Sequence, residues 1–173
     1  PDDECIGTGG SLARYQAGAY SPLTNAMYYG LQNTCADQTA LNNDSAYSFN
    51  ARARIAPGTE NIGTLFAISV ETGKTLWRYD QRAGMMSSVA TGGGLIFTGD
   101  TNGHFRAFDQ QNGAVLWDIN LGSPVTGYPI TYSVRGKQYV AVSTGNSLVS
   151  SGLNRLAPDL KPSNVVVFAL PEN

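Results

Sequence analysis

The sequence is poor in charged residues, and this scarcity excludes two classes of partner. Lysine, arginine, aspartate and glutamate make up 14% of its 173 residues, and the formal net charge is -2. Such a chain has no basic stripe to neutralise phosphates, so we expect neither a nucleic-acid partner nor binding to an anionic membrane. The longest apolar run, VVVFAL from Val165 to Leu170, is far shorter than the roughly 20 residues that span a bilayer.

Histidine and cysteine are almost absent as well. His104 is the one histidine, and Cys5 and Cys35 are the only cysteines. No second histidine or nearby cysteine accompanies His104 to form a metal site, so we expect it at the surface. The sequence also contains no Cys-x-x-Cys-His motif, and we therefore expect no haem on this chain.

The sequence does contain many short strand-like runs. Apolar residues make up 42% of the chain, enough for a globular core, and there are 20 glycines. Runs such as LFAIS, LIFTG, FRAFD and YVAVS are rich in β-formers and are bounded by clusters of Gly, Asn, Asp and Thr. This pattern predicts an all-β fold.

One stretch occurs twice. GTLFAISVETGKTLWRYD begins at Gly63, and GHFRAFDQQNGAVLWDIN begins at Gly103, with five identities in register at an offset of 40. A period of about 40 to 50 residues indicates a propeller or a repeat array, in which one unit cannot bury its faces alone. Helical repeats have similar lengths, but the β-rich runs argue against them.

Each period predicts a four-stranded antiparallel meander, which is one propeller blade. We place three blade-like units at roughly 14–80, 81–120 and 121–173. Trp77 and Trp117 each follow a turn glycine by four residues. There, a ring on the outer strand can pack against the next blade and donate its N–H, so we assign both tryptophans a structural docking role. The third unit lacks a fourth strand, so we expect the remaining, upstream part of a propeller as partner.

Two segments carry a resemblance to a known family. GGGLIFTGDTNGHFRAFDQQNGAVLW and GSPVTGYPITYSVRGKQYVAVSTG resemble the C-terminal blades of the pyrroloquinoline quinone (PQQ) dependent alcohol dehydrogenases. The resemblance implies an eight-bladed propeller in the periplasm, with PQQ and calcium in its central funnel. It also implies oxidation of an alcohol or sugar hydroxyl by hydride transfer to PQQ. The catalytic aspartate and the calcium ligands belong to earlier blades of the family, so we expect none here and an inactive fragment.

The resemblance also suggests which residues lie near the cofactor. An Asn-Trp pair of the family aligns with Arg14-Tyr15, and a tryptophan of some members falls near Met85-Met86. Arg14 suits a PQQ carboxylate, although a solvated surface arginine fits equally well. Met85 and Met86 fit a funnel wall or core filler better than specific cofactor contacts.

Three further expectations complete the sequence analysis. Two cysteines alone fit either a disulfide or two cytosolic thiols, and the resemblance implies a Cys5–Cys35 disulfide and an oxidising compartment. A long loop, residues 146–163, is expected over the funnel mouth. The alternative to a dehydrogenase is a non-catalytic PQQ-repeat propeller that acts as a protein-binding scaffold.

Overall fold

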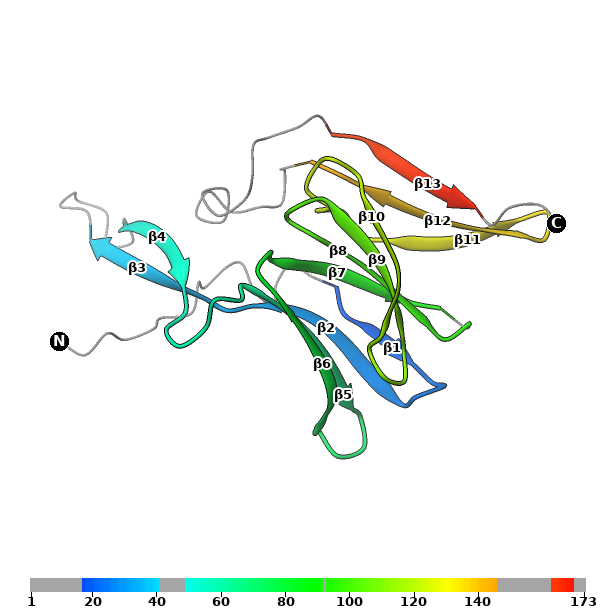
Figure 1. Ribbon diagram of the computed structural model, residues 1–173, viewed down its shortest axis with the longest axis horizontal. Coiled ribbons are helices and arrows are strands. Elements are labelled where there is room, and N and C mark those ends of the chain that lie inside the picture. Colours follow the sequence, from blue (N-terminus) through cyan, green and yellow to red (C-terminus); the bar gives the residue numbers. More distant parts are fainter. Residues whose placement is uncertain (1–16, 41–48, 92, 146–162, 170–173) are drawn as a thin grey trace.

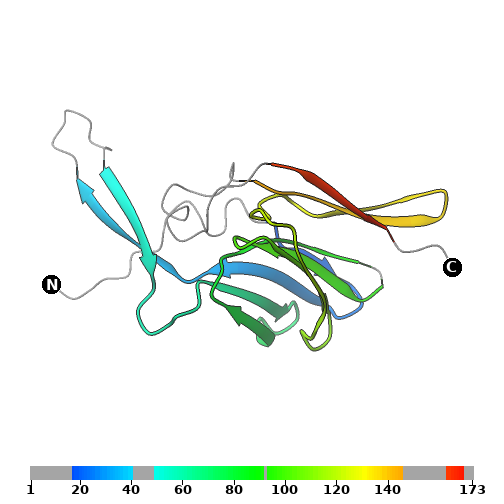
Figure 2. The same ribbon diagram turned by 45° about the horizontal axis from the view of Figure 1, so that its top comes forward.

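The computed structural model describes residues 17–40, 49–91, 93–145 and 163–169, and every regular element in these ranges is a β-strand. Three antiparallel sheets lie one after another along the chain, and a separate hairpin projects from the first (Figures 1 and 2). The predicted all-β propeller class is confirmed. Within the described ranges, no helix is long and apolar enough to cross a membrane.

The first sheet is built from strands that are not all neighbours in sequence. Its order is β1-β2-β5-β6, with bounds β1 (Ala19–Ser21), β2 (Ala26–Gln32), β5 (Gly63–Ser69) and β6 (Thr75–Gln81). The hairpin of β3 (Thr34–Ala40) and β4 (Phe49–Ile55) is inserted between β2 and β5. The sequence analysis missed this hairpin, because it passed from the end of β2 directly to the repeat at Gly63.

The second and third sheets are simple meanders. The second has the order β10-β9-β8-β7, with bounds β7 (Met85–Ala90), β8 (Leu95–Asp100), β9 (His104–Asp109) and β10 (Val115–Asn120). The third has the order β11-β12-β13, with bounds β11 (Ile130–Val134), β12 (Lys137–Ser143) and β13 (Val165–Ala169). Among the described residues, the third sheet therefore has three strands.

The internal repeat extends to the backbone geometry. Gly73 and Gly113 have φ values of 67° and 74°, and each N–H closes a turn onto the carbonyl four residues earlier, at 2.9 and 3.0 Å. A register shift follows each turn, so that Trp77 pairs with Ala67 and Trp117 pairs with Ala107. A β-bulge of this kind re-aims a side chain, and in both copies it places the tryptophan on the face that meets the next sheet.

The sheets pack face to face through two apolar clusters. The cluster between the first and second sheets includes Tyr28, Leu65, Met85 and Phe108, all fully buried. The cluster between the second and third sheets contains four buried residues, Phe105, Val125, Val140 and Val142. Each sheet thus buries its apolar face only against its neighbour, as expected of repeats that are unstable alone.

Gly63 at the start of β5 is required by close packing. A Cβ at this position would lie 2.6 Å from Met85 N and closer still to Ala83 O. We expect Gly63→Ala to lower the free energy of unfolding by about 1–3 kcal/mol, because overpacking forces the backbone apart. Gly93→Ala is the matched control, since its nearest atom would lie 3.9 Å away. Equal denaturation midpoints for the two variants in urea would contradict the packing argument.

Candidate functional site

Aromatic rings join the first sheet to the second. The Tyr28 and Trp77 ring centroids are 5.7 Å apart, and Tyr79 meets Phe108 edge-on at 5.0 Å. Burial raises the pKa of the Tyr28 hydroxyl, while its hydrogen bond to Thr24 opposes that rise. Tyr28 and Trp77 thus contact each other within the first sheet, and the Tyr79–Phe108 pair crosses to the second sheet.

Trp77 contacts the turn of the second sheet. Its indole Nε1–H donates to the carbonyl of Gln110 at 3.0 Å, and the Tyr28 hydroxyl donates to the same carbonyl at 2.9 Å. The indole also lies on Gly113, where a Cβ would come within 2.6 Å of the ring. One backbone carbonyl therefore satisfies two large side chains from the neighbouring sheet, and a glycine makes the close approach possible.

Trp117 lies in the equivalent position at the second interface. Its ring meets Phe168 of β13 edge-on at 5.0 Å and Phe105 at 6.0 Å. Its exposed fraction is 36%. Both tryptophans thus reach from an outer strand to the next sheet in chain order.

Met85 and Met86 begin β7, the first strand of the second sheet, and both are buried. Their exposed fractions are 0% and 4%, and Met85 belongs to the apolar cluster of the first interface. Gln32 Nε2–H donates to Met85 O at 3.3 Å, and Gln81 Nε2–H donates to Met85 Sδ at 2.8 Å. Gln32 Oε1 is buried and has no hydrogen-bond partner among the described residues.

Three residues that the sequence analysis singled out have no described position. Arg14, Tyr15 and Cys5 lie outside the described residues, as do residues 146–162 of the loop expected over the funnel mouth. Cys35 is fully buried in β3. The cofactor contacts, the disulfide and the loop position therefore stay predictions.

A buried ionic cluster closes one end of the first interface, and the sequence analysis missed it. Arg106 Nη1–H donates to Asp100 Oδ2 at 2.7 Å and to Gln81 Oε1 at 2.9 Å, while its Nε–H donates to Asp118 Oδ2 at 2.8 Å. The Arg106 and Asp100 side chains are only 10% and 1% exposed. Arg106 therefore links two carboxylates of its own sheet to an amide of the first sheet. A lone arginine within the apolar run HFRAF was the available signal.

His104 extends this cluster toward solvent. Its Nδ1 lies 2.7 Å from Asp118 Oδ1, and its Nε2 lies 3.2 Å from Asn120 Nδ2. Burial alone would lower the pKa of Arg106, but the hydrogen bond and charge of Asp100 and the hydrogen bond of Asp118 outweigh it, so this pKa is raised. Burial alone would raise the pKa of Asp118, but hydrogen bonds from His104 and Arg106 lower it overall. The cluster thus favours the charged forms of Arg106 and Asp118.

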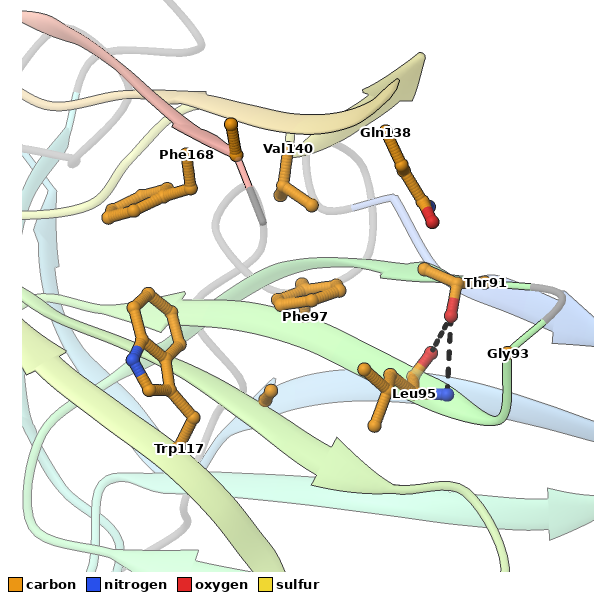
Figure 3. Close-up of a pocket in the computed structure, with 10 residues that line it drawn as sticks. Thr91, Gly93, Leu95, Phe97, Trp117, Gln138, Val140 and Phe168 are labelled. Carbon is orange, nitrogen blue, oxygen red and sulfur yellow. Dashed lines mark hydrogen bonds between the residues drawn. The ribbon is translucent and has the colours of Figure 1, made fainter. Parts of the chain in front are cut away.

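The second interface contains a cavity of about 520 Å³ (Figure 3). Its lining is mostly apolar and aromatic and comes from the β7–β8 connection and from β8, β9, β10, β12 and β13: Thr91, Gly93, Leu95, Phe97, Ala107, Trp117, Gln138, Val140, Phe168 and Ala169. Thr91 Oγ1 is hydrogen-bonded to both the N–H and the carbonyl of Leu95 at 3.3 Å. Few polar groups face the cavity, so it suits an apolar occupant.

The described part of the chain holds no group of three or more His, Cys, Asp or Glu side chains arranged to bind a metal ion.

Comparisons with known proteins point to one group of enzymes. A family model described as PQQ, the glucose/ethanol/alcohol dehydrogenase beta-propeller domain, matches residues 81–140. The chain is 38% identical over 87 residues to a quinoprotein ethanol dehydrogenase of Pseudomonas putida, an alignment covering 50% of this chain and 14% of that protein. It is 34% identical over 148 residues to the dehydrogenase subunit of an alcohol dehydrogenase (quinone) of Acetobacter aceti, covering 76% of this chain and 20% of that protein.

A solved structure agrees with the sequence matches. A europium-containing methanol dehydrogenase superposes with a TM-score of 0.75 at 26% identity, covering 90% of this chain and 32% of that one. This chain spans about a quarter or less of the length of the curated relatives given above.

Removing the arginine of the ionic cluster should strongly destabilise the fold. We expect Arg106→Ala to lower the free energy of unfolding by about 3–5 kcal/mol, because it leaves the Asp100 carboxylate buried without its partner. Arg78→Ala is the control: Arg78 pairs with Asp80 at 3.1 Å, but its side chain is 65% exposed, so we expect less than about 1 kcal/mol. Chemical denaturation of both variants measures the difference, and similar losses would contradict the buried-pair argument.

Asp118 should make stability depend on pH on the acid side. Its folded-state pKa is lowered, so its contribution is present above the unfolded-state pKa of about 3.9 and is lost as the pH falls through the folded value. The contribution is reduced by solvent screening, because the side chain is 37% exposed. We expect Asp118→Asn to lower stability at pH 7 and to flatten its decline below about pH 5. Plots of unfolding free energy against pH that stay parallel for the parent and Asp118→Asn from pH 3 to 7 would contradict this assignment.

Proposed function

Because the chain belongs to the PQQ-dependent quinoprotein alcohol dehydrogenase family, we propose that it forms the C-terminal part of the propeller of such an enzyme. The enzyme would oxidise an alcohol or sugar hydroxyl by hydride transfer to PQQ with calcium assistance. The observation that carries the proposal is the 34% identity over 148 residues to a dehydrogenase subunit. When bound in such a site, PQQ would supply the hydride acceptor, and a bound metal ion would polarise its carbonyl.

The described residues do not by themselves fit PQQ. The cofactor carries carboxylates, which call for cationic or N–H donors. Arg106 already serves two carboxylates and an amide, and Met85 and Met86 expose almost no surface. No step of the reaction is therefore assigned to these side chains. We propose that Arg14 and Tyr15, outside the described residues, contribute to the cofactor rim, and that the methionines pack beneath it.

On this proposal, the described residues pack consecutive sheets of the propeller against one another. Trp77 and Trp117 each reach the following sheet, and Arg106 links the first and second sheets through Gln81. We propose that the remaining sheets of the propeller are supplied by the upstream part of the protein. On this proposal the 173 residues alone are inactive, because the catalytic aspartate and the calcium ligands lie in that upstream part.

A Cys5–Cys35 disulfide and a periplasmic location are part of the same proposal. Cys35 is fully buried at the base of the β3–β4 hairpin. A disulfide to Cys5 would tie the N-terminal segment to this hairpin, and such bonds persist in oxidising compartments. Alkylation of the unfolded protein before and after reduction tests it, since only the reduced sample should be labelled at both cysteines.

The direct test is cofactor loading of the full-length protein. We expect saturable PQQ binding in the presence of calcium, followed by dye reduction on addition of a primary alcohol. A europium arm covers the metal named for the methanol dehydrogenase of similar structure, and a metal-free sample is the control. Absence of PQQ binding with either metal would contradict the proposal and favour the scaffold function.

A further inference from the structure

A chain of contacts ties the single histidine of the sequence to the connection that leads from the second sheet to the third. The His104 ring lies between two side chains of β10, with Nδ1 2.7 Å from Asp118 Oδ1 and Nε2 3.2 Å from Asn120 Nδ2. The Oδ1 atom of Asn120 accepts a hydrogen bond from the Gly122 N–H at 2.7 Å. Gly122 has a φ of 72° and follows the end of β10. The histidine is therefore linked to the backbone of the β10–β11 connection.

These hydrogen bonds fix the position of the proton on the His104 ring. Because Asn120 Oδ1 is bonded to the Gly122 N–H, the Asn120 atom that faces the ring is Nδ2, which can only donate. The Nε2 atom of His104 must then accept, and in a neutral imidazole the other nitrogen carries the proton. Nδ1–H accordingly donates to the Asp118 carboxylate. The contacts thus require a neutral His104 with its proton on Nδ1.

His104 is surrounded by groups that keep one charge while an imidazole titrates. Imidazole ordinarily changes charge between about pH 5 and 8, and the His104 side chain is 35% exposed, so solvent can supply the proton. Asp118 of β10 contacts the ring, Arg106 of β9 bonds the other Asp118 oxygen, and Asp100 of β8 accepts the His104 backbone N–H. The lowered pKa of Asp118 and the raised pKa of Arg106 keep both groups charged over this range.

Protonation of the ring makes one of its two contacts unfavourable. A proton added to Nε2 turns this acceptor into a donor, and the new N–H points at the N–H groups of Asn120. Two donors form no hydrogen bond, so the Asn120 amide must rotate to offer Oδ1 to the ring, and Oδ1 then leaves the Gly122 N–H. The bond from Nδ1–H to Asp118 is kept and is strengthened by the new charge. The amide therefore moves, and the ring stays in place.

The segment held by the Asn120–Gly122 bond leads into the second interface. Leu121 N–H donates to Gly103 O at 2.8 Å, and Val125 N–H donates to Asp100 O at 2.9 Å. Val125 is fully buried in the apolar cluster between the second and third sheets. Gly122 lies between these two anchors. Loss of its hydrogen bond therefore loosens the connection locally and leaves the anchors on either side in place.

We propose that His104, Asn120 and Gly122 form a pH-sensitive latch on the β10–β11 connection. Neutral His104 keeps the latch closed, and protonation of Nε2 opens it by turning the Asn120 amide away from Gly122. The latch is closed at the alkaline end of the range in which imidazole titrates and open at the acid end. This inference does not depend on the dehydrogenase activity.

Amide hydrogen exchange in the full-length protein tests the latch. After correction for the intrinsic pH dependence of exchange, we expect the protection of the Gly122 N–H to fall about five-fold between about pH 8 and about pH 5, the effect of losing one hydrogen bond. The Gly113 N–H is the matched internal control. Gly113 is also a turn glycine with positive φ, but its N–H donates to the backbone carbonyl of Asp109 at 3.0 Å, so its protection should not change.

Two variants assign the response to the histidine. His104→Gln removes the titrating group and should abolish the pH dependence at Gly122, whereas Asn120→Ala removes the acceptor and should lower the protection at both pH values. NMR of the isotopically labelled histidine ring, with the His104 signal identified by its loss in His104→Gln, should find the ring proton on Nδ1 at about pH 8. A proton on Nε2 instead, equal Gly122 protection at the two pH values, or a pH-dependent loss that persists in His104→Gln would each overturn the proposal.

Discussion

The structure depends on one contact, in which a large ring on an outer strand lies against the next sheet and a backbone carbonyl satisfies its polar end. At the first interface the carbonyl of Gln110 accepts hydrogen bonds from both Trp77 and Tyr28. Burying two polar aromatic side chains is favourable only because these bonds are made. The missing Cβ of Gly113 and the bulge before Trp77 permit this close approach.

The two interfaces combine equivalent tryptophans with different surrounding chemistry. The first combines hydroxyls, an amide and the buried Arg106–Asp100 pair with its apolar cluster. The second relies on stacked and edge-on rings of Phe97, Phe105, Trp117 and Phe168. A buried ion pair adds little net stability but is costly to mismatch. We infer that the ionic cluster determines which sheets pack against each other, whereas the apolar contacts of the second interface contribute stability.

Local patterns in the sequence predicted most of the strands but few of the long-range polar contacts. The Gly63 and Gly103 repeat predicted β5, β6, β9 and β10, because turn glycines and alternating residues are local signals. The β3–β4 hairpin was missed although local signals were present: FNARARI alternates apolar with polar residues, and a turn-type cluster, Asn42 to Ser45, separates it from TCADQTA. The partners of Arg106 come from three different strands, and no spacing in the sequence reveals that register. The cavity depends on the relative position of two sheets, which a single sequence does not encode in any short motif.

The burial of Met85 bears on where cofactor chemistry lies in such a propeller. Its side chain is fully buried, so adding further sheets cannot expose it. Its sulfur and its carbonyl already accept hydrogen bonds from Gln81 and Gln32. Met85 therefore contributes packing at the start of β7 and presents no free surface to a cofactor. On the proposal above, that Arg14 and Tyr15 belong to the cofactor rim, these two residues could differ from the family pair without disturbing the contacts of Trp77 with Gly113 and the Gln110 carbonyl.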